Sequence, residues 1–280
     1  MKDRGNRRGS DSTRAFGLGA VMTLVACGET GAPDGAAGAA AGAGGEASPA
    51  AASEARWASV RRAVLDAADA ADADLALSVW DANDLERFEV SRGAFTADTR
   101  VAVASASKFA SGLVLFELIA RGQLSLSSTT GEVLGWAGAH AAISLEQLLS
   151  FTSGLPRDTP CTATLITTLA ACVDSIAELE PESPPGSVFD YGSTHLAVAA
   201  RMAEVASGSS WAELFDEILR VPLGLPADVA YFTFPRRALG RTNPLAAGGL
   251  RASMNEYAPL LQLALHRGTR GALSVGTPEL

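Results

Sequence analysis

A serine and a lysine three residues apart, Ser105 and Lys108, are the side chains in this sequence best suited to covalent catalysis. They follow the alternating stretch 100–103 and open a strongly apolar segment that is predicted to be helical. Positions i and i+3 share one face of a helix, so we expect the hydroxyl and the amine to be neighbours. The positive end of the helix dipole favours a developing alkoxide, and an amine in apolar surroundings loses its proton more readily and can act as a base.

The use of lysine in the rest of the chain strengthens this interpretation. Lys108 and Lys2 are the only lysines, and every other basic residue is an arginine. An arginine cannot supply a deprotonated amine, whereas a lysine can. The alternative is a surface lysine one turn into a helix, which the apolar neighbours Phe109 and Leu113 make less favourable.

A second candidate element begins after the turn signal Pro185-Gly186 and contains Tyr191 and Ser193. Taken alone, Tyr191 is a tyrosine whose hydroxyl caps a turn. Ser193 alone is the N-cap of a helix starting at Thr194. The surrounding motifs, considered together, indicate a catalytic role for both residues, and Ser193 can serve as the N-cap as well.

The chain resembles the serine β-lactamase and penicillin-binding-protein-like superfamily, in its class C, carboxypeptidase and family VIII esterase branch. Ser105-x-x-Lys108 is similar to the first motif of that family, and Tyr191-x-Ser193 to the second, which is usually Tyr-x-Asn. Three further segments resemble motifs of the family in the expected order. Residues 148–156 resemble L-L-x-H-T-S-G-L-P with Phe151 in place of the histidine, residues 222–225 resemble P-L-G-M, and residues 247–253 resemble A-G-G-L-x-S. The resemblance extends from about Ala55 to about Leu273.

This resemblance implies acyl transfer through a covalent serine ester. Ser105 is the implied nucleophile, and Lys108 and Tyr191 are implied to share the role of general base. The Ser105 backbone N–H is one implied oxyanion donor, and Ser193 is implied to position the substrate or shuttle a proton. The implied substrate is a β-lactam, a D-alanyl peptide or an ester, with no cofactor.

The family's third motif, Lys/His-Thr/Ser-Gly, does not occur before Leu280. We therefore expect a domain that is incomplete at its C-terminus and lacks the family's last sheet strands. His266-Arg267-Gly268 has similar letters but is predicted to be a helix C-cap. The alternative function is accordingly a catalytically inactive binding module or a non-functional fragment.

Strands precede helices along the chain, which predicts an α+β fold of the β-lactamase/transpeptidase type, with an N-terminal helix and hairpin and a mainly helical domain. The expected strands are 75–80 and 85–90, joined by a turn at Asn83-Asp84. The expected helices are 53–70, 105–121, 144–150, 194–206, 211–219 and 253–266. Capping boxes are predicted at Ser144 with Gln147 and at Ser253 with Glu256.

The first 26 residues have the basic and then apolar pattern of a signal peptide and end in Leu24-Val25-Ala26-Cys27, which resembles a bacterial lipobox. We expect lipidation of Cys27 and an extracytoplasmic, membrane-anchored protein; the alternative is an ordinary secretory signal. Residues 27–52 are rich in Gly and Ala and predict a flexible tether. The hydrolase domain is expected over residues 53–280.

The remaining composition limits the other functional classes. The net charge of −9 argues against a nucleic-acid partner, and no apolar run is long enough to span a membrane. His140, His195 and His266 lack the spacing of metal ligands, so no metal is expected. In an oxidising compartment, Cys161 and Cys172 are expected to form a disulfide, and the alternative is two free buried thiols.

Overall fold

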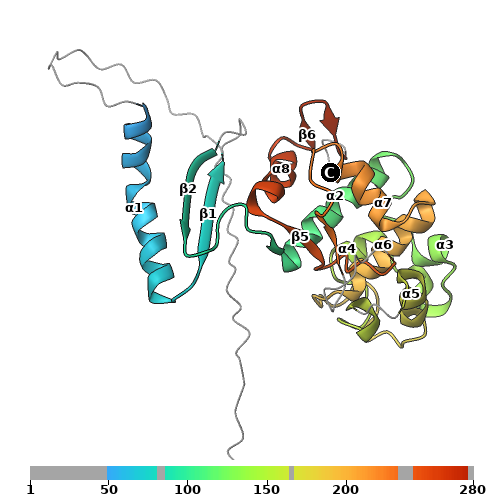
Figure 1. Cartoon of the computed structure of the whole chain (residues 1–280). Coiled ribbons are helices and arrows are strands. Elements are labelled where there is room, and N and C mark those ends of the chain that lie inside the picture. The colour runs from blue at the N-terminus through green and yellow to red at the C-terminus, as the bar shows by residue number, and fades with distance from the viewer. Residues whose placement is uncertain (1–48, 81–85, 164–166, 233–241, 277–280) are drawn as a thin grey trace, which may run out of the picture.

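The computed structural model describes residues 49–80, 86–163, 167–232 and 242–276 (Figure 1). The predicted signal peptide, Cys27, the Gly/Ala-rich segment to residue 48 and the predicted turn at Asn83-Asp84 lie outside these residues. The described part contains both helices and strands, arranged as an N-terminal helix and hairpin followed by a mainly helical body, which confirms the predicted α+β fold class.

The N-terminal unit consists of helix α1 (Pro49–Ala70) and strands β1 (Leu75–Trp80) and β2 (Glu86–Arg92). The strands pair antiparallel, with Leu77 opposite Val90. Trp57 of α1 stacks on Phe88 of β2 with ring centroids 5.1 Å apart. The helical spacing of Trp57 and its apolar neighbours therefore places one face of α1 on the hairpin.

Among the described residues, β1 and β2 pair only with each other. A separate, small three-stranded antiparallel sheet has the order β3-β5-β4 and comprises β3 (Val101–Ala102), β4 (Ala230–Tyr231) and β5 (Leu250–Ala252). This second sheet is important for the site because β3 lies directly before Ser105. A short hairpin of β6 (Thr269–Arg270) and β7 (Leu273–Ser274) follows the last helix.

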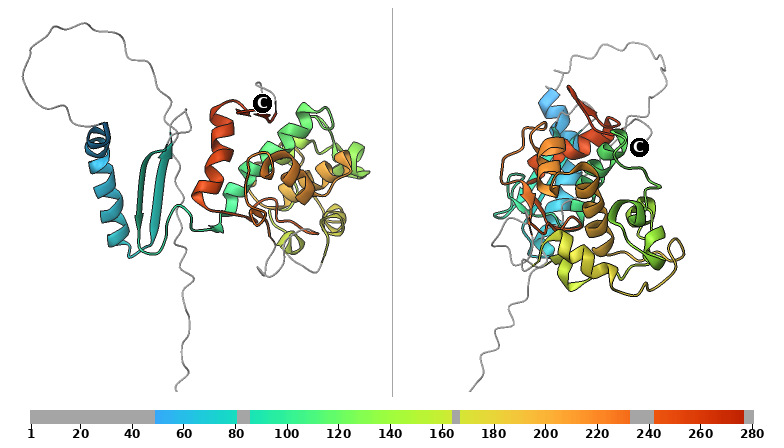
Figure 2. Two further views of the ribbon diagram at one scale, coloured as in Figure 1. Left: turned by 45° about the horizontal axis from the view of Figure 1, so that its top comes forward. Right: turned by 90° about the vertical axis from the view of Figure 1, so that its right-hand side faces the viewer.

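The helical body packs around helix α6 (Thr194–Ser207), which contacts five other helices. These are α2 (Ser107–Ala120), α3 (Thr130–Leu134), α4 (Leu145–Leu149), α5 (Leu169–Ala177) and α7 (Trp211–Phe215). Residues 194–200 of α6 are buried without interruption, so the helix is surrounded by protein rather than amphipathic. Figure 2 shows this body beside the N-terminal helix and hairpin.

Helix α8 (Met254–Leu265) begins at the predicted capping box, in which Ser253 Oγ accepts from the Glu256 N–H and Glu256 caps the Ser253 N–H. The capping box of Ser144 and Gln147 is also present at the start of α4. His266 occupies the C-cap position of α8, which confirms its predicted place at a helix end. None of the described helices is long and apolar enough to cross a membrane.

Several predicted elements differ in the structure. The helix predicted over 211–219 ends at Phe215 and continues as a π-helical turn, Asp216–Arg220. Helices α3 and α5 were not predicted, although Thr129 and Glu132 form a capping box at α3 and Thr168 caps α5. Both helices are short and depend on packing against α6, so their periodicity is too brief to detect. The helix predicted to begin at Ser105 begins instead at Ser107.

Candidate functional site

Ser105 lies in a single 3₁₀ turn, Ala104–Ala106, which leads directly into helix α2. Ala104 has φ +46°, in the left-handed region that residues with a side chain rarely adopt. Strand β3 fixes the chain just before this turn through its pairing with β5, and the Val103 N–H donates to the Leu250 carbonyl at 3.0 Å. The strained turn is therefore held by the sheet and exposes Ser105 at the N-terminal end of α2.

Buried hydroxyl groups hold the carbonyls around this turn. Ser107 Oγ donates to the Ala104 carbonyl at 2.6 Å, and the Tyr257 hydroxyl donates to the Ala106 carbonyl at 2.8 Å. The Tyr231 hydroxyl lies 3.1 Å from the Ser107 carbonyl. Sequence reasoning did not identify Tyr231 and Tyr257 because they are distant in the chain and belong to no local motif. Burial raises the pKa of both phenols, so they act as neutral donors.

The structure distinguishes the two serines of Ser105-Ala106-Ser107-Lys108. Ser107 is fully buried, and its hydroxyl is engaged with the Ala104 carbonyl and the Leu250 N–H. Ser105 is exposed, and its Oγ lies 3.3 Å from the Lys108 amine. Only Ser105 is therefore accessible to a substrate and next to a base. In a 3₁₀ turn, residues i and i+3 eclipse one another, which brings this pair together.

Lys108 contacts three parts of the site. Its Nζ donates to the Ala247 carbonyl at 2.8 Å, approaches Ser105 Oγ and lies 4.6 Å from the centre of the Tyr191 ring. Ala247 begins the A-G-G-L segment, which lies close to the turn. Gly248 of that segment faces Ala104: a Cβ atom at Gly248 would lie 3.9 Å from the backbone C and O atoms of Ala104. The segment thus orients the amine toward Ser105.

The pKa of the Tyr191 hydroxyl is below its ordinary value. Partial burial works to raise this pKa, but hydrogen bonds with Ser105 and Lys108 and the charge of Lys108 outweigh it. The hydroxyl of Tyr191 consequently loses its proton more readily than that of an ordinary tyrosine. The structure therefore brings Ser105, Lys108 and Tyr191 into one hydrogen-bonded group, from segments more than 80 residues apart.

Phe151 packs against the ring of Tyr191. Phe151 has φ +57°, and its ring centroid lies 4.8 Å from that of Tyr191 and 6.0 Å from that of Phe189. Phe189 is 66% exposed and Val188 is 50% exposed, so an apolar surface continues outward from Tyr191. Sequence reasoning noted Phe151 as a departure from the family pattern but did not identify it as part of the site.

Ser193 occupies the predicted N-cap position of α6, although its side chain makes no cap hydrogen bond. Its backbone N–H donates to Asp158 Oδ1 at 2.9 Å, and its hydroxyl also bonds to Asp158. The Asp158 carboxylate competes successfully for the hydroxyl because a charged acceptor forms the stronger bond. Arg157 also pairs with Asp158, at 3.2 Å.

Gly192 allows this loop to approach the chain around Arg157. A Cβ at Gly192 would lie 1.9 Å from the Arg157 carbonyl oxygen, which excludes any larger residue. The same carbonyl accepts a hydrogen bond from the Thr194 N–H at 3.3 Å. Glycine at this position therefore lets the Tyr191–Ser193 segment dock against 157–158.

The loop that carries Asp158 is fastened by the Cys161–Cys172 disulfide, with Cα atoms 5.3 Å apart. Cys172 lies on α5, and the Cys161 carbonyl also accepts from Asn243 Nδ2 at 2.8 Å. The cross-link closes a loop with a sequence separation of 11 residues. The disulfide thus connects α5 to the segment that holds Ser193.

Reduction of this disulfide is expected to lower the free energy of unfolding by about 2–3 kcal/mol, from the loop-closure entropy of a short loop. Urea unfolding with and without dithiothreitol measures the change. The Cys161→Ser/Cys172→Ser double variant should match the reduced protein and be insensitive to reductant. An identical midpoint for oxidised and reduced wild type would contradict this prediction.

His195 is fully buried on the first turn of α6. Its Nε2 lies 2.8 Å from the Asp190 carbonyl, and its Nδ1 lies 2.8 Å from Ser153 Oγ. Burial lowers the pKa of this imidazole, and the charge of Lys108 acts in the same direction, while Asp190 and Asp158 oppose the shift. The imidazole is therefore neutral in the folded protein.

This lowered pKa predicts that the free energy of unfolding decreases as the pH falls below about 6.5, the ordinary pKa of histidine. In that window the unfolded chain binds a proton at His195 and the folded protein does not, so protonation favours unfolding. Urea titrations between pH 5 and 8 measure the effect, and the pH slope near 6 should decrease in His195→Gln. An unchanged slope in that variant would contradict the assignment to His195.

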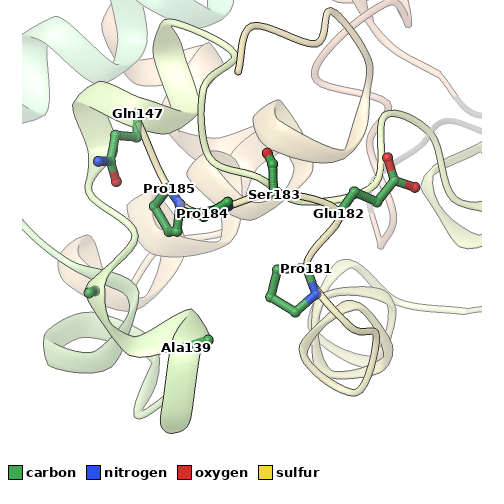
Figure 3. Close-up of a pocket in the computed structure, with 8 residues that line it drawn as sticks. Ala139, Gln147, Pro181, Glu182, Ser183, Pro184 and Pro185 are labelled. Carbon is green, nitrogen blue, oxygen red and sulfur yellow. The ribbon is translucent and has the colours of Figure 1, made fainter. Parts of the chain in front are cut away.

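A shallow depression of about 630 Å³ lies elsewhere, between Gln147 and the proline-rich segment 181–185 (Figure 3). None of Ser105, Lys108, Tyr191 and Ser193 lines it. Its lining carries one carboxylate, Glu182, and no base beside a nucleophile, so it has no catalytic arrangement. Within the described residues, no three His, Cys, Asp or Glu side chains are grouped as metal ligands.

Comparison with known proteins identifies the family of this chain. The Beta-lactamase family model matches residues 51–277. Penicillin-binding protein 4 of Amycolatopsis lactamdurans is 35% identical over 178 residues, which is 59% of this chain and 45% of that protein. The chain thus spans about half the length of this relative.

Solved structures give the same result. The crystal structure of a candidate beta-lactamase from Bacteroides dorei DSM 17855 is 34% identical and has a TM-score of 0.62, covering 70% of this chain and 59% of that one. EstCE1, a hydrolase with promiscuous acyltransferase activity, shares the fold with a TM-score of 0.54 at 20% identity, covering 68% of this chain and 67% of its own. The matched segments, the fold and the grouping of the serine, lysine and tyrosine together show that this chain belongs to the Beta-lactamase family.

Proposed function

We propose that this protein is a serine hydrolase that acts through an acyl-enzyme, with Ser105 as the nucleophile. The observation that carries the proposal is the 3.3 Å approach of Lys108 Nζ to Ser105 Oγ beside a tyrosine whose pKa is lowered. A nucleophile within hydrogen-bond reach of its base is the arrangement that activates a hydroxyl group.

In the proposed first step, Ser105 Oγ attacks the substrate carbonyl and its proton passes to Tyr191 or Lys108. The new ester bond forms as the bond to the leaving group breaks, and the leaving group takes the proton from the same pair. Water then hydrolyses the ester and regenerates the Ser105 hydroxyl. The Ser105 N–H, at the N-terminal end of α2, is the proposed donor to the developing oxyanion.

The substrate class is a β-lactam, a D-alanyl peptide or an ester. The name of the relative from Amycolatopsis lactamdurans supports penicillin recognition, and the exposed apolar surface beside Tyr191 supports a substrate with an apolar group. A lipid on Cys27 is the proposed anchor to a bacterial membrane, outside the cytoplasm. Intact mass of the protein purified from its host, compared with Cys27→Ala, tests this lipidation.

The test of the proposed activity is intact mass after exposure to a fluorophosphonate and, separately, to a penicillin. A stoichiometric gain in mass that is absent in Ser105→Ala supports the proposal, and the probe that labels separates esterase-like from penicillin-recognising chemistry. No gain on protein that is folded by circular dichroism would overturn it and would favour the inactive binding module.

The apolar surface formed by Val188, Phe189 and Tyr191 predicts a preference for longer acyl chains. In Phe189→Ser, kcat/KM for a nitrophenyl hexanoate should fall about tenfold relative to the acetate, because burial of several methylene groups is lost. Val221→Ser is the control, because Val221 is about as exposed as Phe189 but lies on another part of the surface. It should leave the ratio of kcat/KM for the hexanoate to that for the acetate unchanged. An unchanged ratio in Phe189→Ser would contradict the prediction.

A further inference from the structure

The hydroxyl group of Tyr191 must be held against Ser105 and Lys108, yet Tyr191 lies on an exposed loop after a turn. Beside this loop is His195, a fully buried imidazole that the proposed mechanism does not use. We propose that His195 is a positioning residue, which sets the place of the Tyr191 phenol through the Asp190 carbonyl and the Phe151 ring. The catalytic part of this inference rests on the proposed function, but the placement of the phenol does not.

The hydrogen bonds of His195 determine which ring nitrogen carries the proton. The Asp190 carbonyl, 2.8 Å from Nε2, can only accept, so Nε2 must donate. In the neutral ring, Nδ1 then accepts from the Ser153 hydroxyl at 2.8 Å. Ser153 Oγ in turn accepts from the Leu155 N–H at 3.2 Å. Every polar atom of this buried chain is paired, which fixes the orientation of the ring.

The His195 bond reaches the residue that immediately precedes Tyr191. The Asp190 N–H donates to the Phe151 carbonyl at 2.8 Å, so the Asp190 backbone is fastened on both its N–H and its C=O. These two groups belong to the peptide units on either side of the Asp190 Cα atom, so both units are held and little freedom remains for the next Cα atom. The direction in which Tyr191 leaves the backbone is therefore determined by these two bonds.

His195 also supports the ring against which Tyr191 packs. The Phe151 ring meets His195 edge to face, with centroids 5.4 Å apart and an interplanar angle of 88°. Its centroid is 4.8 Å from that of Tyr191. Phe151 has φ +57°, so its backbone depends on its surroundings to keep this conformation. The imidazole thus positions Tyr191 in two ways: through its hydrogen bond to the Asp190 backbone and through its packing on the Phe151 ring.

The other buried histidine provides a contrast. His140 packs edge to face on Trp136 at 5.6 Å, but its Nε2 has no hydrogen-bond partner among the described residues. It contributes bulk to the core without holding a loop carbonyl. A histidine retained only for packing would resemble His140, whereas both ring nitrogens of His195 are paired and one reaches the site.

Two variants separate the hydrogen bonds of His195. In His195→Gln, the side-chain amide nitrogen reaches the position of Nε2 and can still donate to the Asp190 carbonyl. In His195→Asn, the shorter amide can replace Nδ1 toward Ser153 but cannot reach Asp190. We therefore expect the His195→Gln variant to keep the Tyr191 phenol in place and the His195→Asn variant to displace it.

Ultraviolet titration of the phenolate measures that placement without any substrate. The chain has three tyrosines, and burial raises the pKa of Tyr231 and Tyr257, so the first phenolate to appear belongs to Tyr191. In His195→Asn its midpoint should move up toward about 10, the ordinary value for tyrosine. In His195→Gln it should stay close to that of the wild type. Tyr191→Phe identifies the signal.

Kinetics should follow the same order if the proposed function holds. A displaced catalytic group costs up to about a hundredfold in rate, so kcat should fall to that extent in His195→Asn and less in His195→Gln. Because the titration needs no turnover, a protein without activity would overturn the proposed function and still allow the placement to be tested.

His140→Gln is the matched control and should leave the first phenolate midpoint unchanged. Circular dichroism shows whether a variant is folded. If the His195 variants are unfolded, long-range ¹⁵N–¹H spectra of the wild type identify which ring nitrogen of His195 carries the proton. A His195 tautomer with the proton on Nε2 supports the proposal. A proton on Nδ1, or a folded His195→Asn variant with an unchanged midpoint, would overturn it.

Discussion

Replacement of Ser105 by alanine is expected to lower kcat on the order of 10⁶-fold, the loss found when a serine nucleophile is removed from other acyl-transfer enzymes. The reason is that no other described serine combines exposure with a neighbouring amine: Ser107 is buried and bonded to the Ala104 carbonyl. The methyl group of alanine fits the same 3₁₀ turn, so the fold should not change. Turnover of the best labelling substrate, with protein checked by circular dichroism, measures the effect.

Ser127→Ala is the matched control, because it removes the hydroxyl of an exposed serine far along the chain from the site. It should have the kcat of the wild type. Equal turnover in Ser105→Ala and Ser127→Ala would exclude Ser105 as the nucleophile, whatever the substrate.

Replacement of Lys108 by arginine is expected to lower the rate of acylation of Ser105 by roughly 10²–10⁴-fold, the contribution of a positioned general base. The guanidinium keeps a positive charge next to Tyr191 and Ser105, but it cannot give up its proton at accessible pH. The variant therefore removes proton transfer while retaining electrostatic attraction. Stopped-flow labelling by the active probe measures the rate.

Lys108→Met serves as the comparison, since it removes both the base and the charge. If proton acceptance by the amine is the main contribution, the two variants should lose a similar amount. If Lys108 acts only by its charge on Tyr191, the arginine variant should keep most of the wild-type rate and the methionine variant should not. That second pattern would contradict the assignment of Lys108 as a base.

Much of the site follows from local pattern. Ser105 and Lys108 stand at a spacing that places them together in any helical or 3₁₀ turn, so the sequence was enough to predict the pair. The capping boxes at Ser144 and Ser253 are equally local, because they join residues three apart. The α+β class follows from the order of the alternating and helical patterns.

Other features depend on contacts between distant segments. Ser193 occupies the N-cap position that its sequence predicts, but the Asp158 carboxylate, 35 residues away, captures its N–H and its hydroxyl. Helix α2 starts at Ser107 because the Ser107 hydroxyl and the Tyr257 hydroxyl hold the preceding carbonyls in a tighter turn. No pattern within the motif predicts either result.

The sequence alone determined which residues could react, because reactivity depends on residue types and on spacings of a few positions. Only the tertiary structure decided how they are held. The lowered pKa of Tyr191, the fastening of Asp190 by His195 and the disulfide behind Asp158 arise where segments tens of residues apart meet. Such contacts depend on packing around α6, and packing is a property of the whole folded chain rather than of any local stretch.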